Sequence, residues 1–184
     1  MERAVIIGTL EFLGFYFCER ILEEGIEVEG IHLDLEENKV LIEEKRLQIG
    51  RNANYNEWSS MEIRTLNVKG TVLFIDVYDL LMWEKESILF EKGSIKNLID
   101  KYTEGEIIFL LPMSLKSNQK YKDIHAKLHA LSAVLKRKGN SVQSYYLPST
   151  NGTWLTEGID SRDSFNMEEV VDAILEMILK WEGQ

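Results

Sequence analysis

A strand that runs directly into a glycine-bounded helix start constrains the fold of this chain most. Residues Ala4–Ile7 are apolar, Gly8 follows them, and Gly14 lies six residues later within a helical pattern. This order is the outline of a turn that binds phosphate at a helix N-terminus. The middle glycine of such a turn is absent, because position 11 holds Glu11. The sequence therefore predicts a nucleotide-binding fold whose turn is altered at its centre.

Glu11 allows two interpretations. Its carboxylate could satisfy the free amides of the helix that follows, in the place of a phosphate group. Alternatively, it could point to solvent from a remodelled turn. In both cases a carboxylate near the phosphate position takes up space and carries the wrong charge, so ordinary nucleotide binding is not expected.

The rest of the chain alternates between strand and helix patterns. We expect strands at residues 4–8, 26–33, 46–50, 71–77, 106–111 and 142–147, and helices at 12–24, 93–102, 119–138 and 167–181. Residues 34–45 are charged and predict a hairpin or a loop. Strands that alternate with helices form βαβ units and a parallel sheet. We therefore predict an α/β fold in a single domain, residues 1–184: a Rossmann-like doubly wound parallel sheet in the order 3-2-1-4-5-6.

Composition excludes several classes of function. The chain has 21 basic and 31 acidic residues, and its net charge of −10 argues against binding nucleic acid or an anionic membrane. Cys18 is the only cysteine, so an intrachain disulfide and a cysteine-rich metal site are excluded, and we expect an inert core thiol. No signal peptide or long apolar segment is evident, which predicts a cytoplasmic protein.

Several segments, in chain order, resemble the extended short-chain dehydrogenase/reductases, also called NAD-dependent epimerases/dehydratases. They are the turn Gly8–Gly14, the strand Val28–His32, the turn Gly50–Arg51, the segment Gly93–Leu98, the turn Leu147–Gly152 and the segment Arg162–Ile174. The resemblance implies a Rossmann fold that evolved around NAD or NADP.

The same resemblance marks positions that have changed. His32 stands where the family places an acid for the ribose, and Arg51 stands where an acid contacts the adenine. We interpret Gly8, Glu11, Gly14 and His32 as vestigial cofactor-binding positions and expect no cofactor, with weak binding of NAD or NADP as the alternative.

The catalytic pair that the resemblance implies is also incomplete. The family uses a tyrosine and a lysine four residues apart, with a serine at the end of the fifth strand. Tyr121 is followed by His125 instead of lysine, the alternative register places Asp123 before Lys127, and Ser114 is displaced from the strand end. Few residues separate Gly152 from Arg162, so no separate substrate lobe is expected.

These features predict a degenerate, truncated relative of the family with a binding or regulatory role and no catalytic residues. Tyr121 is a weak catalytic candidate. Two alternatives stay open: a weak NAD(P)-dependent oxidoreductase with an atypical site that uses Tyr121, or a protein that binds another small ligand at the carboxyl ends of the strands.

Other side chains are weaker candidates. Asp76 and Asp79 end a buried strand and could bind a cation or a polar ligand, although helix capping or solvent exposure is favoured. His125 and His129 have a spacing that permits metal binding, but no third ligand is evident, so a solvated or interfacial helix face is expected and no metal. Residues 80–83 are apolar and predict core rather than an exposed patch for a partner.

Small residues on the helix 119–138 suggest a partner surface. Ala126, Ala130 and Ala133 form a stripe beside its leucines. In the resembled family this helix and the one at 93–102 often form a dimer interface, so the resemblance implies a possible homodimer through these helices.

Overall fold

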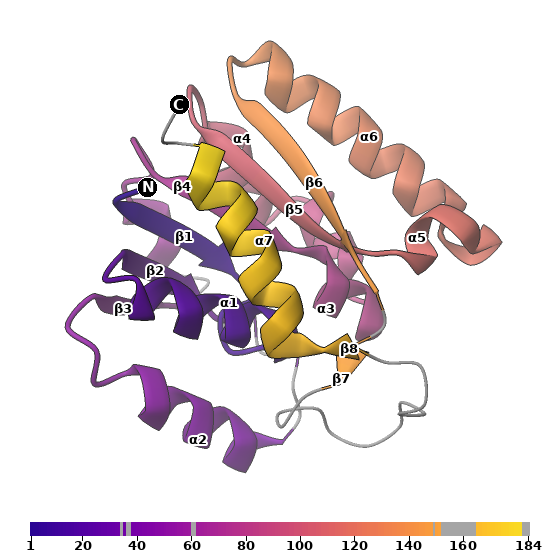
Figure 1. Cartoon of the computed structure of the whole chain (residues 1–184). Helices are drawn as coiled ribbons and strands as arrows, with labels where there is room; N and C mark the ends of the chain where they lie inside the picture. Colours follow the sequence, from indigo (N-terminus) through magenta and orange to yellow (C-terminus); the bar gives the residue numbers. More distant parts are fainter. Residues whose placement is uncertain (34, 36–37, 60–61, 149, 152–164, 182–184) are drawn as a thin grey trace.

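The computed structural model describes residues 1–184 except 34, 36–37, 60–61, 149, 152–164 and 182–184. Its centre is a parallel sheet of six strands in the order β3-β2-β1-β4-β5-β6 (Figure 1). The strands are β1 (Arg3–Ile7), β2 (Glu27–Ile31), β3 (Tyr55–Trp58), β4 (Val72–Asp76), β5 (Glu106–Pro112) and β6 (Ser141–Leu147). The predicted fold class and strand order are confirmed.

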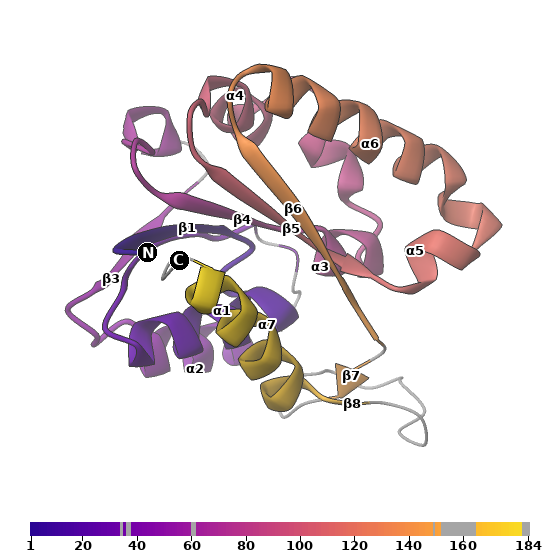
Figure 2. The ribbon, with the colours of Figure 1, turned by 45° about the horizontal axis from the view of Figure 1, so that its top comes forward.

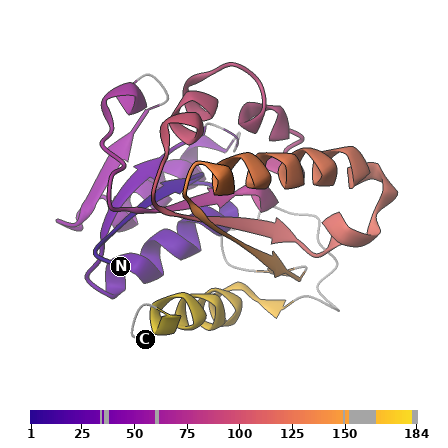
Figure 3. The ribbon, with the colours of Figure 1, turned by 90° about the horizontal axis from the view of Figure 1, so that it is seen from above.

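Helices cover both faces of this sheet. One face carries α1 (Phe12–Glu23), α2 (Lys39–Ile49) and α7 (Met167–Trp181), and the other carries α3 (Val77–Met82), α4 (Ser94–Lys101) and α6 (Lys122–Arg137). Figures 2 and 3 show α6 and α7 on opposite sides of the strands. Short elements connect them: α5 (Ser114–Ser117), the 3-10 turns η1 (Glu62–Thr65), η2 (Glu86–Leu89) and η3 (Gln119–Tyr121), and the strand pair β7 (Thr150–Asn151) and β8 (Phe165–Asn166).

Each face of the sheet has its own apolar core. Phenylalanines and leucines of α1 pack with α7 on one side, and the inward residues of α4 and α6 pack on the other. The strand β1 is buried between them, with residues 4–7 fully inaccessible to solvent. A central strand of a parallel sheet is covered on both faces, which explains its uninterrupted apolar sequence.

The segment 34–50 differs from prediction. Residues 39–49 form α2, and the third strand is Tyr55–Trp58, so the expected hairpin or loop and the expected strand at 46–50 were wrong. The side chain of Asn38 starts the helix by accepting a hydrogen bond from the Leu41 amide (3.3 Å). Ile42, Lys45 and Ile49 face inward at helical spacing, whereas the exposed charges hide this pattern in the sequence.

Because the third strand is Tyr55–Trp58 and not residues 46–50, Arg51 precedes this strand and does not lie at the carboxyl ends of the strands. Arg51 lies in the exposed turn before β3, and Asn54, at the end of that turn, accepts a hydrogen bond from Val28 near the start of β2. The turn Gly50–Arg51 is therefore at the amino-terminal edge of the sheet. The interpretation of Arg51 as the residue beside an adenine was wrong.

The other predicted strands and helices form close to the expected residues, whereas α3 was not predicted as a helix. Leu80 and Leu81 are buried in α3, as the core interpretation of residues 80–83 expected, whereas Met82 is exposed. Asn166 caps α7 by accepting a hydrogen bond from the Glu168 amide (3.0 Å). Gly152, Arg162 and Asp163, which belong to the resemblance, lie outside the described residues. Within the described chain, no helix combines the length and apolarity needed to cross a bilayer.

Candidate functional site

The turn between β1 and α1 keeps the two glycines that its geometry requires. Gly8 has a φ of +99°, a conformation that other residues rarely adopt. A Cβ atom on Gly14 would lie 2.0 Å from the Gly8 carbonyl oxygen. The first turn of α1 therefore packs directly against the end of β1, as in a dinucleotide-binding turn.

The first amides of α1 are occupied by side chains of this same chain. The Leu13 amide donates a hydrogen bond to Asp79 Oδ2 (2.7 Å), and the Gly14 amide donates one to Asp76 Oδ2 (3.0 Å). Asp76 also caps α3, because its Oδ1 accepts a hydrogen bond from the Asp79 amide (2.9 Å). Two carboxyl groups thus lie where amides at the start of such a helix would otherwise bind phosphate.

Burial changes the protonation of this carboxyl pair. Both side chains are inaccessible to solvent within 1%. Burial, together with the neighbouring Asp79 carboxylate, raises the pKa of Asp76 well above its usual range. Burial also raises the pKa of Asp79 to about 6, while hydrogen bonds from Asp76 and from the Leu13 amide oppose the rise. With a pKa of about 6, Asp79 is therefore largely ionised at neutral pH, whereas Asp76 keeps its proton to higher pH than an exposed carboxyl group.

A buried lysine that sequence reasoning missed supports this negative charge. Lys45 is fully buried, and its ammonium donates hydrogen bonds to the carbonyl oxygens of Leu10 (3.0 Å) and Glu11 (3.1 Å). Its positive charge lowers the pKa of Asp79. The available sequence signal was the spacing of Ile42, Lys45 and Ile49, which places the lysine on the inner face of a helix.

Glu11 follows neither of the two interpretations drawn from the sequence. It is the N-cap residue of α1 but its side chain makes no capping hydrogen bond, and it is only 1% exposed. Its Oε1 instead lies 3.3 Å from His32 Nδ1 and accepts long hydrogen bonds from the amides of Leu33 and Leu35 (both 3.4 Å). The carboxylate therefore binds the chain that follows β2, because the α1 amides already have partners.

His32 lies just beyond β2, where the resemblance places a ribose-binding acid. It lines a cavity of about 360 Å³ together with Leu33, Gly93 and Ser94, next to the start of α4. This cavity lies beside the crevice at the carboxyl ends of the strands. It is the side of the crevice where a dinucleotide would place its adenosine part.

The residues compared with the family's catalytic positions lie on different surfaces. Tyr121 and Ser114 line one cavity of about 130 Å³ at the ends of β5 and β6. Among the described residues around that cavity there is no lysine or histidine. His125 lines a separate groove, and the Lys127 ammonium lies 5.7 Å from the centre of the Phe90 ring. Neither of the two sequence registers therefore places a basic side chain beside Tyr121 in this cavity.

The remaining candidates have mainly structural environments. Cys18 is fully buried, and burial raises the pKa of its thiol well above the usual value. Asp76 and Asp79 act as helix caps, as favoured from the sequence. In the described parts of the chain no three histidine, cysteine or acidic side chains are grouped as metal ligands.

The raised pKa of Asp79 predicts how stability depends on pH. The folded state holds this proton more tightly than the unfolded chain, so its stabilising effect is present below pH 4 and is lost as pH rises through about 6. Relative to Asp79→Asn, the wild-type protein should lose about 2 kcal/mol of unfolding free energy between pH 4 and pH 7. Urea denaturation at several pH values measures this difference. The exposed control Asp123→Asn should not change the profile, and parallel profiles for wild type and Asp79→Asn would contradict the assignment.

Known proteins resemble this chain more in fold than in sequence. No family model matches the chain. A relative, the uncharacterized protein YjaV of Bacillus subtilis, is 30% identical over 112 residues, which cover 54% of this chain and 60% of that protein. The match therefore spans less than two thirds of YjaV.

Solved structures give a broader match. A short-chain dehydrogenase/reductase from Vibrio parahaemolyticus superposes with a TM-score of 0.65 at 12% identity, covering 94% of this chain and 91% of that chain. The fold is that of the short-chain dehydrogenase/reductases. Yeast methylglyoxal/isovaleraldehyde reductase Gre2, solved with NADPH, has a TM-score of 0.61 at 13% identity, and the match covers 94% of this chain and 70% of the Gre2 chain. Serine dehydrogenase from Escherichia coli has a TM-score of 0.61 at 12% identity, and the match covers 95% of this chain and 89% of the dehydrogenase chain. Identities this low establish the fold alone.

Proposed function

We propose that this protein is a non-catalytic Rossmann-fold protein with a binding or regulatory role, and that it works without NAD or NADP. The observation that carries the proposal is the carboxyl pair at α1. Leu13 and Gly14, whose amides a pyrophosphate would need, already donate to Asp79 and Asp76. The proposed relationship to the epimerases/dehydratases, with loss of the cofactor turn and of the catalytic pair, accounts for a retained fold with a filled site.

Electrostatics supports this proposal. A pyrophosphate at α1 would approach the buried Asp79 carboxylate and Glu11, which has its carboxylate beside His32. Like charges at 4 Å repel by about 1 kcal/mol in water and by about 4 kcal/mol at an effective dielectric constant of 20. A dinucleotide would also have to displace the carboxyl groups of Asp79 and Asp76 from the Leu13 and Gly14 amides. The displaced carboxyl groups would then lose these hydrogen bonds in a buried place, which costs free energy.

Calorimetry with NAD, NADP and their reduced forms tests the proposal. We expect dissociation constants no tighter than about 1 mM for the wild-type protein. In the double variant Asp76→Ala/Asp79→Ala, checked for folding by circular dichroism, affinity for ADP should rise at least about tenfold because the amides become free. Asp100→Ala, at an exposed acid, is the control. Low-micromolar binding of a dinucleotide to the wild type would contradict the proposal.

One observation favours a second candidate function. Tyr121 and Ser114 line the same cavity at the carboxyl ends of β5 and β6. We propose as the runner-up a weak NAD(P)-dependent oxidoreductase that uses Tyr121, or a small-ligand site in this cavity. NADPH oxidation with a panel of small aldehydes distinguishes them, because turnover that is lost in Tyr121→Phe would favour the enzyme.

Association through α4 and α6 stays a prediction. Ala126, Ala130 and Ala133 are exposed on α6, so the small-residue stripe is accessible in the described chain. We propose a homodimer formed through these helices, without a nucleic-acid or membrane partner, in the cytoplasm.

A further inference from the structure

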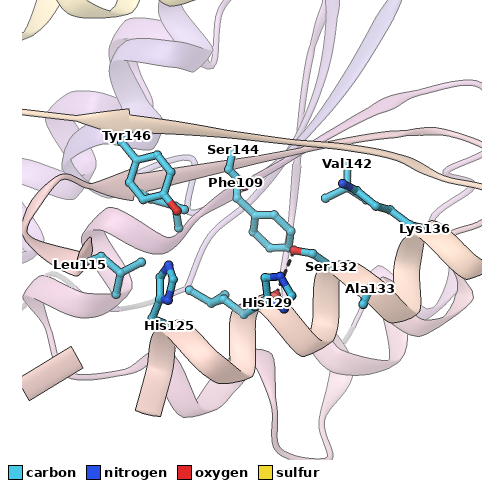
Figure 4. Close-up of a pocket in the computed structure, with 12 residues that line it drawn as sticks. Phe109, Leu115, His125, His129, Ser132, Ala133, Lys136, Val142, Ser144 and Tyr146 are labelled. Atoms are coloured by element: carbon cyan, nitrogen blue, oxygen red, sulfur yellow. Dashed lines mark hydrogen bonds between the residues drawn. The ribbon is translucent and has the colours of Figure 1, made fainter. Parts of the chain in front are cut away.

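A groove between α6 and the edge of the sheet is distinct from the cofactor-like crevice. It has a volume of about 230 Å³ and lies between α6 and the last strand, β6. Leu128, Leu131 and Leu135 hold α6 against the sheet from the side facing the core. The flank of the helix next to these leucines, with His125, His129 and Lys136, faces β6 across open space (Figure 4).

The side chains around this groove are basic or neutral. His125, His129 and Lys136 come from α6, and Ser144 and Tyr146 come from β6 (Figure 4). None of the described residues that line it is acidic, in a chain with 31 acidic residues. The adjoining Lys116 lies over the Tyr146 ring, with Nζ 3.6 Å from the ring centre. Within the described chain, neither Lys116 nor Lys136 forms an ion pair with an acidic side chain.

The charge of the surrounding segment has the same sign. Residues 113–141, which include α5 and α6, contain seven lysines and arginines and one acid, Asp123. The rest of the molecule is strongly acidic, so the potential of this surface differs from that of the whole protein. A concave surface with one sign of charge concentrates ligands of the opposite sign.

The floor of the groove is apolar. Phe109, Leu111 and Leu115 form it, and the donors stand around it. The Ser132 hydroxyl donates to the Leu128 carbonyl oxygen (2.9 Å), so it offers a ligand only its lone pairs. The donors that remain are the two imidazoles, the two ammonium groups and the hydroxyls of Ser144 and Tyr146. Pockets for drug-sized ligands are usually larger than 300 Å³, so this one suits a single ring or a short chain.

We propose that the groove between α6 and β6 binds a small organic anion, a carboxylate or a phosphate monoester on a short apolar group. The apolar group lies on Phe109 and Leu115, and the anionic group meets His129, Lys136 and the donors of β6. This site goes beyond the proposed function and does not depend on the carboxyl pair at α1, and the groove shares no lining residue with the cavities at the strand ends. It shares Ala133 with the stripe proposed for the homodimer.

The chain's three histidines make the test direct. We would follow the imidazole C–H resonances of His32, His125 and His129 by NMR during titration with phenyl phosphate, benzoate and the neutral analogue benzyl alcohol. We expect saturable shifts for His125 and His129 with an anion and none for His32, which lies beside Glu11. Saturation by phenyl phosphate alone or by benzoate alone identifies the anionic group.

Variants separate this site from general attraction to a basic surface. Lys136→Gln and His129→Gln should each weaken anion binding about fivefold or more, because the first removes an ammonium charge and the second an imidazole donor from the groove. Lys122→Gln removes the same charge from an exposed position on α6 outside the groove and should change affinity less than about twofold. Equal weakening by all three variants, shifts that do not saturate, or equal shifts with benzyl alcohol would overturn the proposal. None of these outcomes bears on the carboxyl pair at α1.

Discussion

Gly14→Ala is expected to destabilise the protein by at least about 3 kcal/mol, or to prevent folding. The new Cβ atom would lie 2.0 Å from the Gly8 carbonyl oxygen and 3.3 Å from the Thr9 amide nitrogen. These are backbone atoms, so a side-chain rotation cannot relieve the overlap. The first turn of α1 would have to move away from β1. The hydrogen bond from the amide of residue 14 to Asp76 would then lengthen or break.

Chemical denaturation followed by circular dichroism measures this effect. Gly93→Ala is the matched control, because a Cβ atom there meets nothing within 4 Å and the backbone is extended, with φ of −178°. The control should change the unfolding free energy by no more than about 0.5 kcal/mol. A Gly14→Ala protein as stable as the control would mean that the strand and the helix are not in the close contact described here.

Lys45→Met should cost about 3 kcal/mol of unfolding free energy at pH 7. Methionine keeps much of the length and apolar contact of the lysine side chain but removes its charge and donors. The carbonyl oxygens of Leu10 and Glu11 would lose their hydrogen bonds with the ammonium group, and the buried Asp79 carboxylate would lose a favourable charge.

The dependence of this effect on pH tests its origin. Below about pH 6, Asp79 is increasingly protonated in the folded state, so the charge of Lys45 matters less and the cost of Lys45→Met should fall. Lys39→Met, at an exposed position on the same helix, should have little effect at any pH. A cost for Lys45→Met that is the same at pH 5 and pH 7 would mean that the lysine acts through its carbonyl contacts and not through Asp79.

Patterns among neighbouring residues predicted most strands and helices of this protein. The apolar run of β1, the two glycines of the turn and the apolar periodicity of α1 and α6 are properties of neighbouring residues, and each element formed where expected. The strand order followed because parallel strands with helical crossovers permit few arrangements. The segment 34–50 was misread because exposed charges outnumber the inward residues Ile42 and Ile49.

The candidate site was predictable only in part. Asp76 and Asp79 could be placed at the edge of the crevice, since they follow a buried strand. Their contact with α1 joins residues 62 and 66 positions apart, and it depends on side-chain directions that no local pattern encodes. Glu11 was recognised as foreign to the turn, but its partner His32 comes from the end of another strand. The histidine pair on α6 was visible from its spacing, whereas the groove requires β6 opposite it.

The carboxyl pair at α1 also satisfies two helix amides without a bound small molecule. A dehydrogenase that binds a dinucleotide gains stability by mass action, by an amount that rises with the concentration of free cofactor. Here the carboxyl groups that accept from the helix amides are covalently part of the chain, at an effective concentration that dilution cannot lower. The contribution of these two hydrogen bonds to stability should therefore not change when NAD or NADP is scarce.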